Sequence, residues 1–246
     1  MKQTLSKGQL NSNQLKLIAI AAMTFDHLVW TFFPGCQYVW WVWSLHIVGR
    51  ITAPIMWFFI AEGCFYTRNK GRYTARLFFF AVLSHFAFDF AFGIPFFDPA
   101  AGIFGRTSVL WSLAIASAVI FLTQSKKMPM IWKYVLLAAA CIVSLPSDWS
   151  AIAVVCPFFL YQHRGDFKKQ ARDIGIWTFI YALFYFIFLD KPYAFLQLLT
   201  CLSIPLLSRY NGRRGNGKGM KWFFYIYYPA HLVVIGILRL LIHSNI

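Results

Sequence analysis

The chain has 246 residues, of which 59% are hydrophobic, 20% aromatic and only 13% charged. Ordinary soluble domains carry roughly 25% charged residues, so this composition excludes a soluble globular protein and indicates a membrane protein with several spans. The net charge of +15 comes from Lys and Arg that fall in every second loop between apolar runs. This is the positive-inside pattern of a membrane protein, and we expect no nucleic-acid partner.

Nine apolar runs predict an all-α bundle of about nine transmembrane helices. They are Leu15–Phe33, Ser44–Tyr66, Thr74–Gly93, Thr107–Thr123, Trp132–Leu145, Trp149–Tyr161, Asp173–Leu189, Tyr193–Ser208 and Lys221–Leu241. The first run is too long for a cleavable signal peptide, so we expect it to be retained as a span. The fifth and sixth runs are short for a membrane core of ~30 Å.

The basic loops predict the orientation of these spans. The segments 2–16, 68–76, 126–133, 164–172 and 209–221 hold 19 of the 23 basic residues. With these loops in the cytoplasm, the N-terminus is inside and the C-terminus outside. Joining the two short runs into one span would move the later basic loops outside, so we expect a hairpin there, split at Pro146. We expect residues 1–246 to form a single membrane domain.

The first run contains Asp26 and His27 side by side at mid-membrane depth. A carboxylate and an imidazole at this depth are costly, so the pair predicts a functional site. Adjacent helical residues point about 100° apart, and we therefore expect Asp26 to contact another helix, through Arg50 or His85, rather than His27.

Other polar residues lie in other spans at spacings that group them. Counting about 1.5 Å of rise per residue places Asp26, His27, His85 and His231 roughly 15–17 Å from the cytoplasmic boundary. His46, at the membrane edge, is four residues from Arg50, and His85 is four residues from Asp89, so each pair shares a helix face. The remaining candidates are Glu62, near the inner end of the second span, and Tyr228, three residues before His231.

Two interpretations of this set remain open at this point. In the first, the polar groups only pair for packing, and Arg50 needs a carboxylate, Asp26 or Asp89, because an unpaired buried guanidinium is very costly. Alternatively, an imidazole acts as general base toward an amine or hydroxyl that attacks an acyl group, with a carboxylate stabilising the imidazolium. No Ser or Cys is well placed as a nucleophile, so direct transfer is favoured over an acyl-enzyme.

Three stretches of the chain resemble the TraX family of integral-membrane acetyltransferases. These are LKLIAIAAMTFDH in the first span, IVGRITAPIMWFFIAEG (Ile47–Gly63) in the second and FYIYYPAHLVV (Phe224–Val234) in the last. The family is similar to larger transmembrane acyltransferases that move an acyl group from cytoplasmic coenzyme A to an acceptor on the other side. Its best-known members acetylate the N-terminus of conjugative pilin. The resemblance implicates Asp26, His27, Arg50, Glu62 and His231.

The resemblance therefore implies an acyl-CoA-dependent acyltransferase in the bacterial cytoplasmic membrane. Acetyl-CoA would be the co-substrate, bound at the basic inner face by residues such as Arg213 and Arg214, and the acceptor would be an exported peptide, a glycan or a lipid. His27 is the expected base and Asp26 its catalytic partner. Arg50, Glu62, His85, Asp89, Tyr228 and His231 are expected to bind the substrates.

Two other functions remain as alternatives. The same Asp and His residues would suit the proton relay of a proton-coupled transporter or flippase. A structural subunit of a conjugation or pilus apparatus would need no catalytic residues. The five cysteines (Cys36, Cys64, Cys141, Cys156 and Cys201) show no CxxC or metal-ligand spacing, so no metal is expected.

Overall fold

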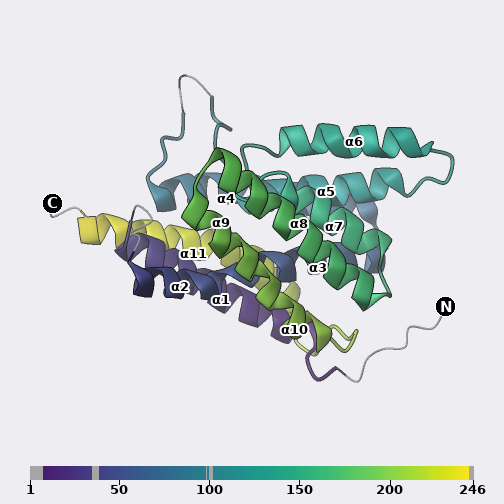
Figure 1. Ribbon diagram of the computed structural model, residues 1–246, viewed down its shortest axis with the longest axis horizontal. Helices are drawn as coiled ribbons and strands as arrows, with labels where there is room; N and C mark the ends of the chain where they lie inside the picture. Colours follow the sequence, from purple (N-terminus) through teal and green to yellow (C-terminus); the bar gives the residue numbers. More distant parts are fainter. Residues whose placement is uncertain (1–7, 35–38, 98, 100–101, 244–246) are drawn as a thin grey trace. The chain divides into compact units, whose positions relative to one another are not determined.

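The computed structural model describes residues 8–34, 39–97, 99 and 102–243, and the regular structure in these ranges is helical (Figure 1). Extended pairing in this part of the chain is limited to two isolated bridges, Leu10 with Tyr210 and Thr107 with Ser147. The all-α class is therefore confirmed. Cys36 and residues 2–7 of the first basic segment lie outside the described residues.

The helices follow the predicted spans closely. They are α1 (Ser12–Phe32), α2 (Trp40–Arg50), α3 (Thr52–Tyr66), α4 (Lys70–Phe92), α5 (Val109–Thr123), α6 (Met130–Val143), α7 (Ile152–Gln162), α8 (Phe167–Phe188), α9 (Lys191–Leu198), the 3₁₀ turn η1 (Leu199–Leu202), α10 (Ser203–Ser208) and α11 (Met220–His243). Taking α2–α3 and α9–η1–α10 as continuous segments, the described residues form nine helical segments, one at each predicted span.

Five of these segments are long and apolar enough to cross a membrane. They are Ser12–Phe32, Trp40–Tyr66, Lys70–Phe92, Phe167–Phe188 and Met220–Ile242. Helices α5, α6 and α7 are apolar but have only 10–17 residues. Several long apolar helices of this kind are consistent with a membrane protein. The number of actual crossings and the orientation of the termini stay predictions.

A proline explains why the second predicted span is divided into α2 and α3. The break falls at Ile51, whose φ of −70° and ψ of −20° are still nearly helical. Pro54 has no N–H to donate to the carbonyl of Arg50, four residues earlier, so the hydrogen-bond ladder is interrupted at this turn. The chain keeps its direction and continues as α3.

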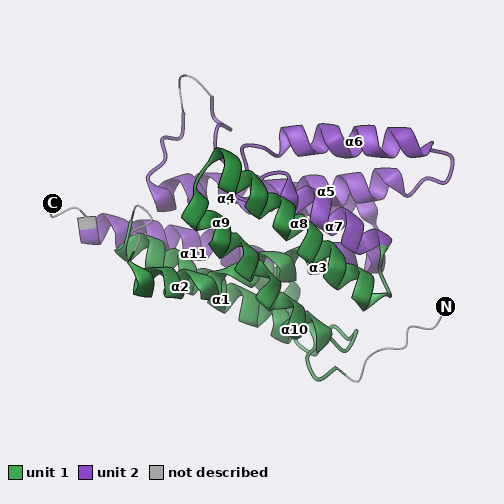
Figure 2. Ribbon diagram, in the orientation of Figure 1, with its two compact units in different colours: residues 1–59, 163–224 green, residues 60–162, 225–246 purple. Residues whose placement is uncertain are grey.

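The contacts of the chain divide it into two compact units, each built from two separate stretches (Figure 2). Unit 1 contains residues 1–59 and 163–224, with α1, α2, most of α3 and α8 to α10. Unit 2 contains residues 60–162 and 225–246, with α4 to α7, the end of α3 and most of α11. Each unit is described by itself below.

In unit 1, the loop after α10 closes the start of α1. The backbone N–H of Ser12 donates to the carbonyl of Arg213 at 2.9 Å, and that of Asn13 donates to Arg214 at 3.2 Å. Asn11 and Gln14 complete a capping box, each side chain bonding the other's backbone. The first backbone donors of α1 are therefore satisfied without solvent.

In unit 2, α5 is the central helix. It packs against both α4 and α7, and Leu113, Ala114, Ala116 and Ile120 are almost completely buried. Small residues such as these alanines let neighbouring helices approach closely. Helix α6 is different, because Leu137 and Ala140 are its buried residues while most of its other large apolar side chains are exposed.

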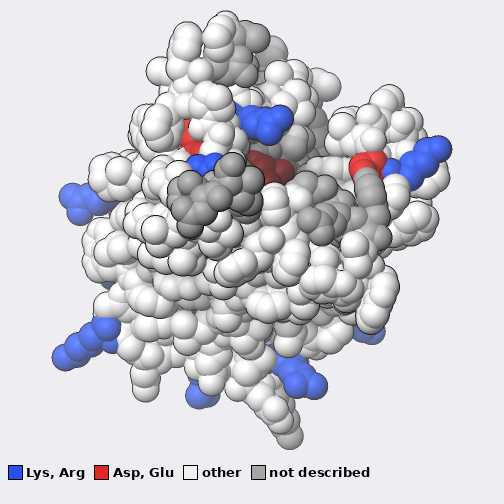
Figure 3. Space-filling view, turned by 90° about the vertical axis from the view of Figure 1, so that its left-hand side faces the viewer, with Lys and Arg blue, Asp and Glu red and all other residues white. Residues whose placement is uncertain are grey.

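The surface fits an apolar solvent. Large apolar side chains such as Phe79, Trp132, Phe179 and Phe188 are more than half exposed. On the face drawn in Figure 3, uncharged atoms cover most of the surface and Lys and Arg side chains are scattered. Exposure of this kind is expected where lipid, rather than water, surrounds the helices.

Candidate functional site

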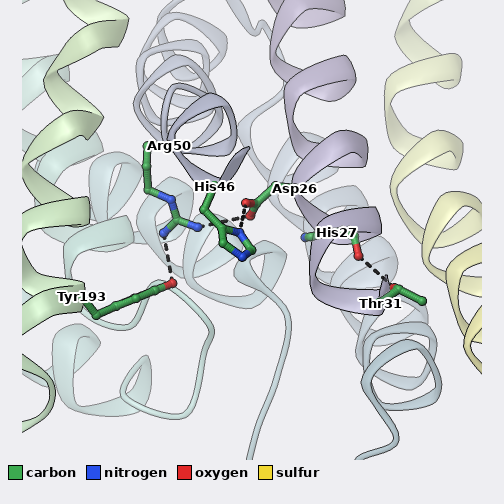
Figure 4. A network of polar contacts seen from close by, with 6 residues as sticks. All are labelled: Asp26, His27, Thr31, His46, Arg50 and Tyr193. Atoms are coloured by element: carbon green, nitrogen blue, oxygen red, sulfur yellow. Dashed lines mark hydrogen bonds and ion pairs between the residues drawn. The ribbon is translucent and has the colours of Figure 1, made fainter. Parts of the chain in front are cut away.

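In unit 1, the carboxylate of Asp26 is held by two residues of α2 (Figure 4). His46 Nδ1 lies 2.7 Å from Oδ1 of Asp26, and Arg50 Nη2 donates to Oδ2 at 3.2 Å. The side chains of His46, Arg50 and Asp26 are only 1%, 6% and 10% exposed. Both oxygens of the carboxylate are therefore bonded, which a buried carboxylate requires.

The sequence of α2 brings these groups to Asp26. His46 and Arg50 are four residues apart and so face the same side of the helix. Gly49 lies between them, and a Cβ at this position would come within 2.4 Å of Cβ and Cγ of Asp26. Only a glycine lets the two helices approach closely enough for these bonds. A hydrogen bond from Thr52 Oγ1 to the carbonyl of Ala19, at 2.9 Å, fixes the same register further along.

Aromatic residues surround this polar cluster. Tyr193 of α9 accepts a hydrogen bond from Arg50 Nη1 at 3.2 Å, and its ring also lies 5.6 Å from the guanidinium carbon. The ring of Trp30 lies on His46, with 4.6 Å between ring centroids. These rings exclude water from the Asp26–Arg50 pair, which strengthens its electrostatic attraction.

The two imidazoles near Asp26 differ in how accessible they are. His46 is enclosed, and its Nε2 has no hydrogen-bond partner among the described residues. His27 is half-buried and interacts electrostatically with the Asp26 carboxylate. Its backbone carbonyl accepts a hydrogen bond from Thr31 Oγ1 at 2.9 Å. Of the two imidazoles, His27 is the more exposed.

The other predicted site residues lie in unit 2. Glu62, at the end of α3, is buried, as are His85 and Asp89 of α4, whose Nδ1 and Oδ2 are 3.5 Å apart. On α11, Tyr228 and His231 are also buried. Nδ1 of His231 meets the backbone carbonyl of Tyr227 at 3.1 Å, and the ring of Tyr227 stacks on the imidazole.

The sequence analysis identified part of this arrangement. The expected contact between Asp26 and Arg50 is confirmed, and the expected shared face of His46 and Arg50 is confirmed as well. The histidine bonded to Asp26 is His46, not His85. Tyr193 was missed because nothing in its own segment marks it, whereas the Gly49-Arg50 dipeptide was a visible signal of a close helix contact.

Comparisons with known proteins cover nearly the whole chain. The chain is 30% identical over 230 residues to the probable fimbrial assembly protein FimC, serogroup H1, of Dichelobacter nodosus, which is 90% of this chain and 93% of that protein. No solved structure matches the chain. The model of the family described as TraX protein matches residues 11–239, from just before α1 to near the end of α11. The chain therefore belongs to the TraX family.

Proposed function

We propose that this chain is a membrane-embedded acyltransferase that acts in the assembly of a protein fibre at the cell surface. It would transfer an acetyl or similar acyl group from cytoplasmic acyl-CoA to an amine or hydroxyl of an exported acceptor at the outer face of the bacterial cytoplasmic membrane. The role in fibre assembly is suggested by the relative named as a probable fimbrial assembly protein. The acyl transfer rests on the site in unit 1 and on the resemblance to transmembrane acyltransferases.

The observation that carries the proposal is the fixed carboxylate beside a half-buried imidazole. Asp26 is held at both oxygens, by His46 and Arg50, and it interacts electrostatically with half-buried His27. A carboxylate fixed in this way stabilises positive charge that develops on His27 without having to reorient. His46 and Arg50 act through Asp26 and are positioning residues.

The proposed reaction is a single transfer step. His27 takes the proton from the acceptor N–H or O–H as the nitrogen or oxygen attacks the thioester carbonyl. The carbon–sulfur bond then breaks, and the leaving thiolate receives the proton from the imidazolium. The products are an amide or ester and free coenzyme A thiol. At the basic loop of unit 1, exposed Arg213 and Arg214 form no ion pair among the described residues, so their charge suits the phosphates of the nucleotide.

The test is transfer by the purified full chain in detergent. The wild type is incubated with acetyl-CoA and a periplasmic extract, and release of free thiol is measured together with acetyl groups gained by peptides, glycans and lipids, by mass spectrometry. We expect His27→Gln to abolish both readouts while acetyl-CoA still raises the thermal unfolding midpoint. His46→Gln is the matched control, because it removes a buried imidazole and should weaken transfer only in part. Full activity of His27→Gln would contradict the assignment.

A structural subunit of a fibre-assembly apparatus is the second candidate. The observation that favours it is that the fimbrial assembly relative aligns over 93% of its own length. A cell that carries Asp26→Asn in place of the wild-type gene distinguishes the two. If the chain is an enzyme, that strain should make unmodified fibres or none, although the protein is present in the membrane. If the chain is a structural subunit, that strain should make normal fibres.

A further inference from the structure

Unit 2 contains a second carboxyl–imidazole pair that the proposed reaction does not use. His85 and Asp89 are four residues apart on α4, and Nδ1 of His85 lies 3.5 Å from Oδ2 of Asp89. Both side chains are only 1% exposed. The ring of Phe104, from the segment that links α4 to α5, lies 5.0 Å from the imidazole and stacks on Trp111.

This pair lacks the partners that Asp26 has. Asp89 Oδ1, both ring nitrogens of His85 and the hydroxyl of neighbouring Ser84 are buried without a hydrogen bond among the described residues. Buried polar atoms of this kind are rare in folded proteins, and several of them at one place indicate a bound polar species.

Among the described residues, no Lys or Arg forms an ion pair with Asp89. Helix α5 has no titratable residue. Arg239 of α11 reaches α4, but its Nη2 donates to the carbonyl of Phe90 at 3.3 Å, and Arg239 forms no ion pair with Asp89. The other titratable groups of unit 2 on these described elements are Tyr225, Tyr227, Tyr228 and His231 of α11, Glu62, Cys64 and Tyr66 at the end of α3, and Arg106 of the linking segment. The group that acts electrostatically on Asp89 is His85.

The net charge of the His85–Asp89 pair therefore depends on how many protons the two side chains bind. An ionised Asp89 beside a neutral His85 would leave a net negative charge in an apolar interior, at a very high cost in free energy. One additional proton makes the pair neutral. With that proton on His85, Nδ1–H would face Oδ2 of Asp89 across a long 3.5 Å, and Nε2–H would have no acceptor among the described residues, so the carboxyl is the better position.

We propose that Asp89 and His85 form a proton-binding site in unit 2, with the exchangeable proton on the Asp89 carboxyl. The site is independent of the acyl transfer proposed above, because it lies in the other unit and has its own residues. Phe104 covers it and limits exchange with the outside.

An apolar carbodiimide tests the proposal in the wild-type chain. N,N′-dicyclohexylcarbodiimide enters apolar regions and reacts with a carboxyl that carries its proton. The proton moves to a nitrogen of the reagent, the carboxyl oxygen bonds its carbon, and the adduct rearranges to a stable N-acylurea with no leaving group. We expect mass spectrometry of peptides to find the adduct on Asp89 at neutral pH and to find Asp26, which is ion-paired, unmodified. Asp89→Asn should lose the adduct.

The variant Phe104→Ala is the control for entry of the carbodiimide. It removes the covering ring and should speed the labelling of Asp89. A second readout needs no reagent: the infrared C=O band of a protonated carboxyl should disappear in Asp89→Asn and persist in Asp26→Asn. The proposal fails if Asp89 stays unlabelled in Phe104→Ala, if Asp26 is labelled as readily as Asp89, or if Asp89→Asn leaves the infrared band unchanged.

Discussion

Gly49 of α2 lies directly against the side chain of Asp26 in α1. A Cβ at residue 49 would come within 2.4 Å of Asp26 Cβ and Cγ and within 2.7 Å of Oδ1. The hydrogen bonds from His46 and Arg50 to the same carboxylate therefore depend on the absence of one methyl group. This dependence makes the site testable by the smallest possible substitution.

Gly49→Ala should destabilise unit 1 and disturb the site. Inserting a methyl group into a packed interface typically costs about 1–3 kcal/mol, because helices or side chains must shift. Gly175→Ala is the matched control, since Gly175 is also helical in unit 1 but has open space around its Cβ position. Replacing glycine by alanine there should be neutral or stabilising by roughly 0.5–1 kcal/mol. Thermal unfolding of the two variants in detergent micelles compares them, and equal stability would argue against the close approach.

Asp26→Asn should be among the most destabilising single changes in unit 1. It removes the carboxylate to which buried Arg50 donates, and breaking a buried ion pair costs about 3–5 kcal/mol. The double variant Asp26→Asn with Arg50→Gln should recover part of this loss, because the buried charge is then absent too. Unfolding measurements on the two single variants and the double variant form a complete cycle. Strict additivity of the two single effects would show that the residues are not coupled.

Tyr193→Phe should weaken the site through the contact with Arg50. The change removes the hydroxyl that accepts from Arg50 Nη1 and leaves the ring, so the expected loss is that of one hydrogen bond to a charged group, about 1.5–3 kcal/mol. Tyr134→Phe on exposed α6 is the control, because Tyr134 has no hydrogen bond among the described residues and should tolerate the change. If the two variants unfold alike, Arg50 does not depend on Tyr193.

Gly93 and Gly102 separate backbone strain from steric contact in unit 2. Both have positive φ, +67° and +72°, so alanine is strained at each by about 1–2 kcal/mol. A Cβ at residue 93 would also lie 2.0 Å from Arg239 Nη1, whereas nothing lies within 4 Å of a Cβ at residue 102. Gly93→Ala should therefore lower the free energy of unfolding more than Gly102→Ala does. The expected difference is about the contribution of the hydrogen bond from Arg239 to the carbonyl of Phe90. The difference between their unfolding midpoints measures that contact.

The predicted helices were found because hydropathy and length are local properties. Each of the nine predicted spans has a helical segment, and the short hairpin around Pro146 is present as α6 and α7. The least accurate boundary was the start of α8, which we expected at Asp173 and which lies at Phe167. The start of α2 was expected at Ser44 and lies at Trp40, one turn earlier. His46 lies within the helix by either boundary, and the structure places it against Asp26.

Pairing between helices was predictable only in part. Spacing within a helix correctly placed His46 with Arg50 and His85 with Asp89, since residues four apart always share a face. Charge compensation correctly matched Arg50 with Asp26. Spacing cannot say which helix lies opposite, so the contribution of Tyr193, which is 143 residues from Arg50 along the chain, was not foreseen.

The discontinuous construction of unit 1 has a consequence for its biosynthesis. Asp26, His46 and Arg50 all emerge from the ribosome within the first two helices and can pair as soon as these are in the membrane. Tyr193, which completes the cluster, and the carbonyls of Arg213 and Arg214, which cap α1, are made only after the whole central stretch of unit 2. During translation the ion pair therefore exists for some time without its final enclosure. A nascent chain halted before Tyr193 should already hold the paired carboxylate, in a form still open to solvent and to quality-control proteases.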